Sequence, residues 1–296
     1  MTSEMTRGGL RDHADSRPLP VREVRRLAAL VARAMESGEP TAPLHLAFPE
    51  VDGAEAERIR AALLDHAAGG APHWAVAVDP APGGELLPVL VTAGMVHPGD
   101  RVLVERPDAV VLRARLLLRA AACSPGLLPP LALCWELRRQ VYGNVPGPAD
   151  LIAANAGVLL VVPGDLPGEA ARGRESGPVA WHVSAGGDPA AEGVVTAEDI
   201  HDDLAWAAEL TGDPFAYVLS RPLGPPLGPG VGTATLSAVS DGRTCSVTVA
   251  LAAPARSRAR KDPGPTGPGT PGLLTGRGTA SPAPHLVPGD SPPGQR

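Results

Sequence analysis

Residues 98–119 read PGDRVLVERPDAVVLRARLLLR, and this stretch decides the predicted fold. Pro98, Gly99 and Asp100 predict a turn that leads into a strand over residues 101–105. Asp108 can then cap a helix that runs to about residue 122, with its leucines mostly inward and its arginines outward. A strand, a turn and a helix in this order form half of a βαβ unit.

The flanking sequence continues this alternation of helix and strand. Apolar residues at helical spacing predict an amphipathic helix over residues 21–35, and Asp52 with Glu55 predicts the capped start of a second helix. Residues 150–155 predict a short helix that ends at Gly157. Thr196 with Asp199 predicts the start of a later helix that ends at Gly212. Strands are predicted at residues 73–78, 158–162, 179–183 and 215–219, and a hairpin joins residues 233–239 to 244–251 through Asp241 and Gly242.

These elements predict an α/β fold with a mostly parallel sheet, flanking helices and a C-terminal β-hairpin. Residues 1–18 are expected to form a disordered N-terminus and residues 19–252 a single α/β domain. Residues 253–296 are rich in Pro and Gly and are expected to form a disordered tail, because they cannot bury enough apolar surface to offset the entropy of ordering.

Composition excludes several classes of function. The net charge of -6 provides no basic surface for nucleic acid, and no apolar run is long enough to span a membrane. The three cysteines are too widely spaced for a disulfide framework or a zinc site. Because the N-terminus also lacks the apolar stretch of a signal peptide, we expect a cytoplasmic protein. The content of Ala, Gly, Pro and Arg is typical of a GC-rich bacterial genome, as in actinobacteria.

One residue type is almost missing. Lys261 is the only lysine of the 296 residues, and it lies in the predicted tail. The folded region therefore offers no lysine for chemistry, and this favours a protein without catalytic activity.

The loop over residues 220–230 follows a predicted strand and contains the residues we expect to bind a cofactor. Glycines after a strand let backbone amides approach a phosphate, and Ser220 adds one hydroxyl. The candidate cofactor-binding residues are Ser220, Gly224, Gly228 and Gly230. Four prolines and the missing lysine favour the alternative that this segment is only a rigid connecting loop.

Several motifs together resemble the N-terminal region of adenylate-forming enzymes, the superfamily of acyl-CoA synthetases. Pro98-Gly99-Asp100-Arg101-Val102 matches a turn of that family, and Glu136-Leu137-Arg138 is similar to a helical motif. Ala156-Gly157 followed by an apolar strand, and Asp213-Pro214 followed by the glycine loop, occupy the corresponding places. The resemblance covers roughly residues 60 to 230.

The departures from that family imply a degenerate, truncated relative. Leu227 stands where the family has its loop lysine, the loop lacks the family's run of hydroxyls, and the later ATP-binding motifs are missing. The resemblance therefore implies a non-catalytic AMP-binding-like protein with a binding or interaction role. No catalytic residue, no metal site and no cofactor are expected, apart from a residual capacity to bind a nucleotide or acyl-CoA.

A rival resemblance and three smaller patterns lead to weaker hypotheses. Residues 92–105 also resemble part of the fold-type I aminotransferases, which need a lysine for their Schiff base. His201, Asp202 and Asp203 can bind a metal only with partners from elsewhere, so an acidic first turn of a helix is the simpler interpretation. Cysteines 123 and 134 lack an evident base, and the four tryptophans are better explained as core than as a ligand pocket.

Two alternatives to the leading hypothesis stay open at this point. One is an uncharacterised enzyme that uses Cys, His or carboxylate chemistry, which would not need a lysine. The other is a structural or regulatory domain with no small-molecule site. In every case the partner is an unknown small molecule or protein, with no nucleic acid and no membrane.

Overall fold

The computed structural model describes residues 18–68, 75–80, 86–91, 101–119, 131–164, 178–211, 217–228, 230–240 and 243–253. All of them belong to one compact unit, Met1–Ala255. The predicted N-terminal segment, the predicted tail and the Asp241-Gly242 turn lie largely or wholly outside the described residues. The predicted domain boundaries therefore stay predictions.

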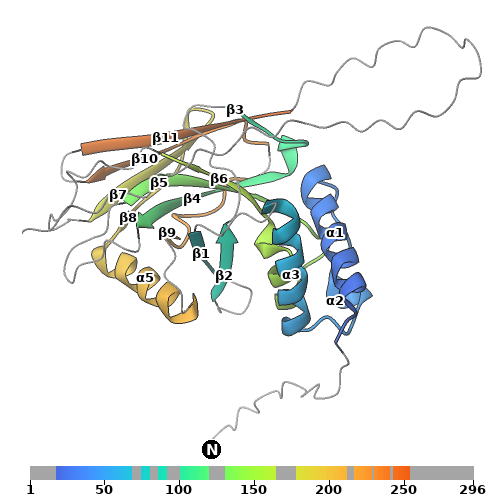
Figure 1. The fold of residues 1–296 in the computed structure, drawn as a ribbon. Coiled ribbons are helices and arrows are strands. Elements are labelled where there is room, and N and C mark those ends of the chain that lie inside the picture. Colours follow the sequence, from blue (N-terminus) through green and yellow to red (C-terminus); the bar gives the residue numbers. More distant parts are fainter. Residues whose placement is uncertain are drawn as a thin grey trace, which may run out of the picture. The chain divides into compact units, whose positions relative to one another are not determined.

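A helical layer contains one of the three apolar cores. Its helices are α1 (Val21–Ser37), α2 (Leu44–Ala47), α3 (Gly53–Ala68) and α4 (Pro148–Ala153). Helices α1 and α3 pack side by side (Figure 1). The predicted apolar stripe of α1 is confirmed, because Val24, Leu27 and Val31 are buried in this core. The predicted start of α3 is also confirmed, since the Glu55 amide donates to Asp52 Oδ1 at 2.9 Å.

A six-stranded sheet has the order β2-β1-β9-β4-β5-β6. Its strands are β1 (Ala75–Pro80), β2 (Leu86–Val91), β4 (Val110–Arg119), β5 (Leu131–Arg139), β6 (Val158–Pro163) and β9 (Tyr217–Leu219). Within it only β1 and β9 pair in parallel. The edge strands β2 and β6 also lie close to each other, so the sheet curls back on itself.

A second, five-stranded sheet has the order β3-β11-β10-β7-β8. Its strands are β3 (Arg101–Leu103), β7 (Val179–Ala185), β8 (Asp188–Val195), β10 (Thr233–Ser240) and β11 (Arg243–Ala252). Strands β10 and β11 pair antiparallel from Thr233↔Ala250 to Ser240↔Arg243, which confirms the expected C-terminal pair.

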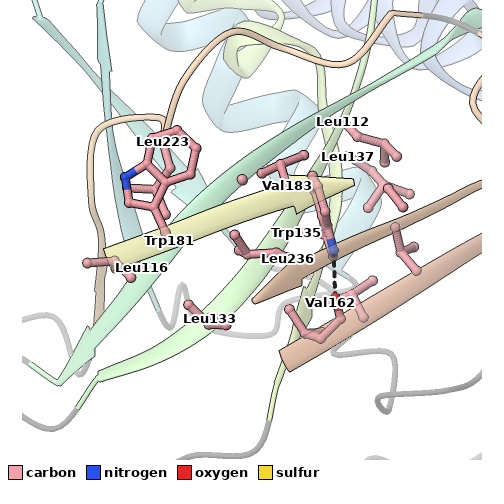
Figure 2. Close-up of a cluster of buried hydrophobic side chains, with 14 of the residues drawn as sticks. Leu112, Leu116, Leu133, Trp135, Leu137, Val162, Trp181, Val183, Leu223 and Leu236 are labelled. Atoms are coloured by element: carbon pink, nitrogen blue, oxygen red, sulfur yellow. Dashed lines mark hydrogen bonds between the residues drawn. The ribbon is translucent and has the colours of Figure 1, made fainter. Parts of the chain in front are cut away.

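The main core lies between the two sheets (Figure 2). Trp135 of β5 is fully buried there, and its indole Nε1 donates to the Val247 carbonyl of β11 at 3.1 Å. Trp181 of β7 packs in the same core near Leu223 (Figure 2). Both tryptophans therefore act as packing residues, which was the preferred interpretation of the sequence.

Helix α5 (Ala197–Thr211) completes this core. Ile200 and Ala207 point into it, and α5 contacts β1, β2 and β9. The predicted cap is confirmed, since the Asp199 amide donates to Thr196 Oγ1 and the Thr196 amide to Asp199 Oδ2. The second sheet and α5 thus cover one face of the six-stranded sheet.

The opposite face of the six-stranded sheet is enclosed by the curl of the sheet. Its apolar residues are mostly small, and they include Ala75, Ala77, Ala132 and Cys134. Small side chains leave room on this inner face for longer, charged ones.

The helix predicted over residues 108–122 is wrong. A short 3₁₀ turn, η1 (Pro107–Ala109), is followed directly by strand β4. Leu112, Ala114 and Leu116 face the core between the sheets, whereas Arg113 and Arg115 point to the inner face of the curl. Side chains that point to the same face at every second residue are typical of a strand. The sequence did not show this alternation clearly, because leucines are buried on both faces of β4.

The expected mostly parallel sheet is corrected by the same finding. The α/β class holds, but both sheets are mixed and mainly antiparallel, with parallel pairs only at β1–β9 and β11–β3 among the described strands. A helix after β3 would have provided the crossover that a parallel neighbour needs, whereas β4 and β5 pair as antiparallel strands. Glu136-Leu137-Arg138, expected in a helix, lies in β5.

None of the helices in the described part of the chain is long and apolar enough to cross a membrane.

The core between the sheets predicts a large effect for Trp135→Ala. Removing a fully buried indole and its bond to Val247 should lower the free energy of unfolding by about 3–5 kcal/mol. Val194→Thr, at a 59% exposed position on β8, is the control and should change it by less than about 0.5 kcal/mol. Urea unfolding of both variants measures this, and an equal effect would contradict the assignment of the core.

Candidate functional site

Five charged side chains gather on the inner face of the curled sheet. Asp79 comes from the end of β1, Arg113 and Arg115 from β4, and Glu136 and Arg138 from β5. Each pair on one strand is two residues apart, so both members point to the same face. The antiparallel register places Arg113 opposite Glu136, which brings the two strands' charges together.

Arg115 lies at the centre of this cluster and is fully buried. Its Nε donates to Glu136 Oε2 at 2.7 Å, and its Nη2 donates to Asp79 Oδ1 at 3.1 Å. Its Nη1 donates to the carbonyls of Val78, at 2.7 Å, and Ser220. Arg115 therefore joins β1, β4, β5 and the segment after β9.

Arg138 links the same two carboxylates from the other side. Its Nη1 donates to Asp79 Oδ2 at 2.7 Å and its Nη2 to Glu136 Oε1 at 2.6 Å. Arg113 completes the cluster, since its Nη1 donates to Asp79 Oδ1 at 2.5 Å. All four carboxylate oxygens thus accept from guanidinium groups.

The pKa values reflect this pairing. Burial alone would raise the pKa of Glu136, but the charges and hydrogen bonds of Arg115 and Arg138 outweigh it and lower the pKa to about 2. Burial opposes the charge of Arg138 as well, yet Glu136 and Asp79 raise its pKa. Both groups therefore stay charged at neutral pH.

Arg113 is the least satisfied member of the cluster. Three guanidinium groups share two carboxylates, so the cluster carries one net positive charge. The pKa of Arg113 is lowered, first by burial and then by the charge of Arg138. Its Nε is buried with no hydrogen-bond partner in the described structure, and its side chain is 24% exposed. A site of this kind favours an anion.

A pocket of about 210 Å³ opens beside this cluster. Its polar lining consists of Arg113, Arg138, Arg139 and Gln140. The rest of the lining is apolar or backbone: Val111, Val141, Tyr142, Pro146, Leu151, Ala154, Ala156 and Gly157. The pocket therefore lies where the ends of β4 and β5 meet α4 and the turn that follows it.

That turn, η3 (Asn155–Gly157), has an unusual backbone. Asn155 and Ala156 have positive φ angles of 47° and 50°, and Gly157 has a φ of 74°. A Cβ at Gly157 would lie 2.2 Å from the Arg139 carbonyl oxygen, so only glycine allows this close approach to β5. Left-handed backbone at residues other than glycine is often found at functional sites.

Arg139 fixes the helical layer next to the pocket. Its Nη1 donates to the carbonyls of Met35 and, at 2.7 Å, Glu36, which lie at the C-terminal end of α1. Its Nη2 donates to the Glu105 carbonyl. The guanidinium thus satisfies helix-end carbonyls that lack partners within α1.

The predicted cofactor-binding residues lie in a loop along β4, and none of them lines the pocket. The Ser220 amide donates to the Leu116 carbonyl, and its hydroxyl accepts from the Leu116 amide, both at 2.9 Å. A Cβ at Gly224 would lie 2.8 Å from the Trp181 ring, whereas Gly228 and Gly230 face open space. Backbone hydrogen bonds from Leu223 and Leu227 to β4 hold the rest of this loop along that strand. A ligand at these four residues stays a prediction.

The other sequence candidates do not converge on one site. His201 and Asp202 are exposed on α5, while the buried Asp203 accepts from the Arg221 amide at 2.8 Å. Burial raises the pKa of the Cys134 thiol, so it is a poor nucleophile at neutral pH. Cys245 is free and exposed, and Cys123 lies outside the described residues.

Sequence reasoning missed the charge cluster itself. Its signal was the alternation of Arg113 and Arg115 with apolar residues in β4, and of Glu136 and Arg138 in β5. The helix predicted for the first stretch placed Arg113 and Arg115 on its outer face, and Glu136 and Arg138 were assigned to a helical motif of the resemblance.

Sequence comparison gives no relative for this chain. No protein-family model matches it, and no curated protein matches it.

Comparison with solved structures identifies the fold. The 4-oxalocrotonate decarboxylase from Pseudomonas putida G7, complexed with magnesium and adipate, superposes with a TM-score of 0.62 and 15% identity, over 80% of this chain and 100% of that chain. The same enzyme complexed with calcium and acetate gives a TM-score of 0.59, with the same identity and coverage. A 5-carboxymethyl-2-hydroxymuconate delta-isomerase from Mycobacterium smegmatis gives only 0.43 at 13% identity, over 62% and 79% of the two chains.

This fold corrects the resemblance to adenylate-forming enzymes, which is wrong. The similar structures are of a decarboxylase and not of an adenylate-forming enzyme, and Glu136-Leu137-Arg138, one motif of the resemblance, lies in strand β5 and not in a helix. The AMP-binding-like, non-catalytic interpretation depended on this resemblance and is also wrong.

The expectation of no cofactor is also wrong for this fold, because the similar structures contain magnesium or calcium. We tested whether residues of this chain fit such an ion. Within the described ranges no group of three or more His, Cys, Asp or Glu side chains converges. The two carboxylates of the cluster, Asp79 and Glu136, give all their oxygens to arginines. The described residues therefore do not fit a divalent cation.

The cluster predicts a pH-dependent stability that Glu136→Gln removes. The pKa of Glu136 is about 2 in the folded state against 4.5 for the free side chain, so its stabilisation is present above about pH 4.5 and is lost as the pH falls towards 2. At neutral pH the variant should be less stable by about 3–5 kcal/mol, because two buried arginines lose a charged partner. Between about pH 6 and 3 its stability should fall less than that of the wild type.

Glu192→Gln on β8 is the matched control, since Glu192 is exposed. Its stability should follow the wild type across the same pH range in urea unfolding. If the stability of Glu136→Gln fell with pH as steeply as that of the wild type, Glu136 would not be ion-paired in the folded protein.

Proposed function

We propose that this protein binds a small organic carboxylate in the arginine-lined pocket. The observation that carries the proposal is the unsatisfied guanidinium of Arg113. Its one hydrogen bond in the described structure uses Nη1, and Nε is buried, so Nη2 is the donor left for a ligand. A guanidinium N–H forms a strong, charge-assisted hydrogen bond with a carboxylate oxygen.

The electrostatics of the cluster support the same proposal. Its excess positive charge lies in a partly buried place, where an anion interacts more strongly than in water. The volume of about 210 Å³ is smaller than the roughly 300–1,000 Å³ of pockets for drug-sized ligands, so a small acid suits it.

A second candidate function is catalysis on the bound carboxylate. It is favoured by the fold, which extends over the whole length of a decarboxylase. This is the enzyme alternative that the sequence left open, with carboxylate or His chemistry in preference to the buried Cys134. The missing lysine does not argue against it, because chemistry that uses carboxylate or His side chains needs no lysine. A cytoplasmic location and the absence of a nucleic-acid partner stay predictions.

Arg113→Gln tests the binding function. Titration of the wild type with a panel of acetate, hexanoate, benzoate and adipate, followed by NMR chemical shifts or calorimetry, should show saturable binding of at least one acid. The variant should bind that acid at least about tenfold more weakly, because a charge-assisted hydrogen bond is lost.

Arg101→Gln on β3 is the matched control, because Arg101 is exposed and does not line the pocket. It should bind as the wild type does. No binding of any acid, or equal binding by Arg113→Gln, would contradict the proposal. NMR spectra of the same samples over time distinguish binding from turnover, since an enzyme would convert the ligand and a binding protein would leave it unchanged.

A further inference from the structure

We propose that Arg115 serves as the cation of the charge cluster, so that the cluster takes up no divalent ion and needs none. The cluster consists of Asp79, Arg113, Arg115, Glu136 and Arg138. The inference goes beyond the proposed function, because it concerns how the two buried carboxylates are neutralised and not what the pocket binds. One consequence, for the carboxylate ligand, rests on the proposed function and has its own test.

The groups around Arg115 are of the kind that surrounds a metal ion. Its guanidinium donates to two carboxylate oxygens, Glu136 Oε2 at 2.7 Å and Asp79 Oδ1 at 3.1 Å. It also donates to two backbone carbonyls, those of Val78, at 2.7 Å, and Ser220. Carboxylates and backbone carbonyls from several segments of the chain are the ligands that a calcium ion takes. Here the centre of such an oxygen set is filled by a fully buried side chain of the protein itself.

The other sides of the two carboxylates are closed as well. Asp79 Oδ2 and Glu136 Oε1 accept from Arg138 at 2.7 Å and 2.6 Å. Asp79 Oδ1 also accepts from Arg113 at 2.5 Å. A metal ion would have to displace one of these bonds before it could reach a carboxylate oxygen. This is strongly unfavourable, because a buried guanidinium would lose its charged partner.

The net charge of the cluster also opposes a divalent cation. Three guanidinium groups and two carboxylates give a net charge of +1 before any ion binds. A divalent ion would make this charge +3 in a buried place, where like charges repel each other more strongly than in water. An anion lowers the same charge. The cluster therefore suits a carboxylate beside it and not a metal ion within it.

Manganese titration of the full chain, followed by NMR, tests the inference on the wild type. Mn²⁺ is paramagnetic and broadens the signals of nuclei close to its binding site. The amide signals of Asp79, Arg115 and Glu136 should broaden no more than those of Val247 and Val249, which lie in the core between the sheets. Selective broadening of the first three signals would overturn the inference, whether or not any acid binds in the pocket.

The affinity for the carboxylate ligand is the second test, and it rests on the proposed function. Calorimetric titration uses the acid that binds best among acetate, hexanoate, benzoate and adipate. Its dissociation constant should be the same within about twofold in Mg²⁺ and in EDTA, because the guanidinium of Arg113 makes the contact directly. An affinity at least about tenfold higher in Mg²⁺ would overturn the inference and leave the proposed function intact. If no acid binds in either solution, the proposed function fails, and the manganese titration still decides on the inference.

Arg115→Ala tests whether the charge at the centre of the cluster is what matters. Guanidinium ion at millimolar concentration should raise the melting temperature of this variant by about 2 °C or more relative to sodium chloride, because the ion can occupy the vacated centre. Arg115→Met is the matched control and should not respond, since an uncharged side chain fills the same place. A folded Arg115→Ala that does not respond would contradict the role of Arg115. The manganese titration needs no variant, so it tests the inference even if both variants fail to fold.

Discussion

The rest of the site depends on the buried guanidinium of Arg115. It bonds Asp79 and Glu136 and the carbonyls of Val78 and Ser220, and so connects three strands with the loop after a fourth. Buried charges are costly unless they are paired, and here every carboxylate oxygen has an arginine donor. The small residues of the inner face provide the space that this network needs.

The network also explains why the pocket should favour an anion. Two carboxylates cannot neutralise three arginines, and the residual charge falls on Arg113, which has the fewest bonds and the greatest exposure of the three. The glycine-dependent turn at Gly157 and the Arg139 contacts to α1 bring an apolar helical wall to the same place. The positive charge at Arg113 and the apolar helical wall together form a small amphipathic site. The fold is that of a metal-containing decarboxylase, but the described side chains have different chemistry from a metal site.

The sequence predicted the elements whose apolar residues follow one clear helical or strand spacing. It failed where the apolar residues fit both spacings. Helices α1, α3 and α5 and the pairing of β10 with β11 were predictable, because their apolar stripes, caps or alternation are local signals. Strand β4 was not, because leucines on both faces and arginines at 113, 115 and 119 also fit a helix. The charge cluster could not be predicted either, because Asp79, Arg115 and Glu136 meet only through the pairing of strands that are far apart in the sequence.

A crystal structure of the protein grown with hexanoate tests the central claim most directly. We expect the ligand's carboxylate to accept from Arg113 Nη2 in the pocket, with the Asp79 and Glu136 bonds of the cluster intact. A carboxylate bound elsewhere, or a cluster in which Glu136 is released from Arg115, would contradict it.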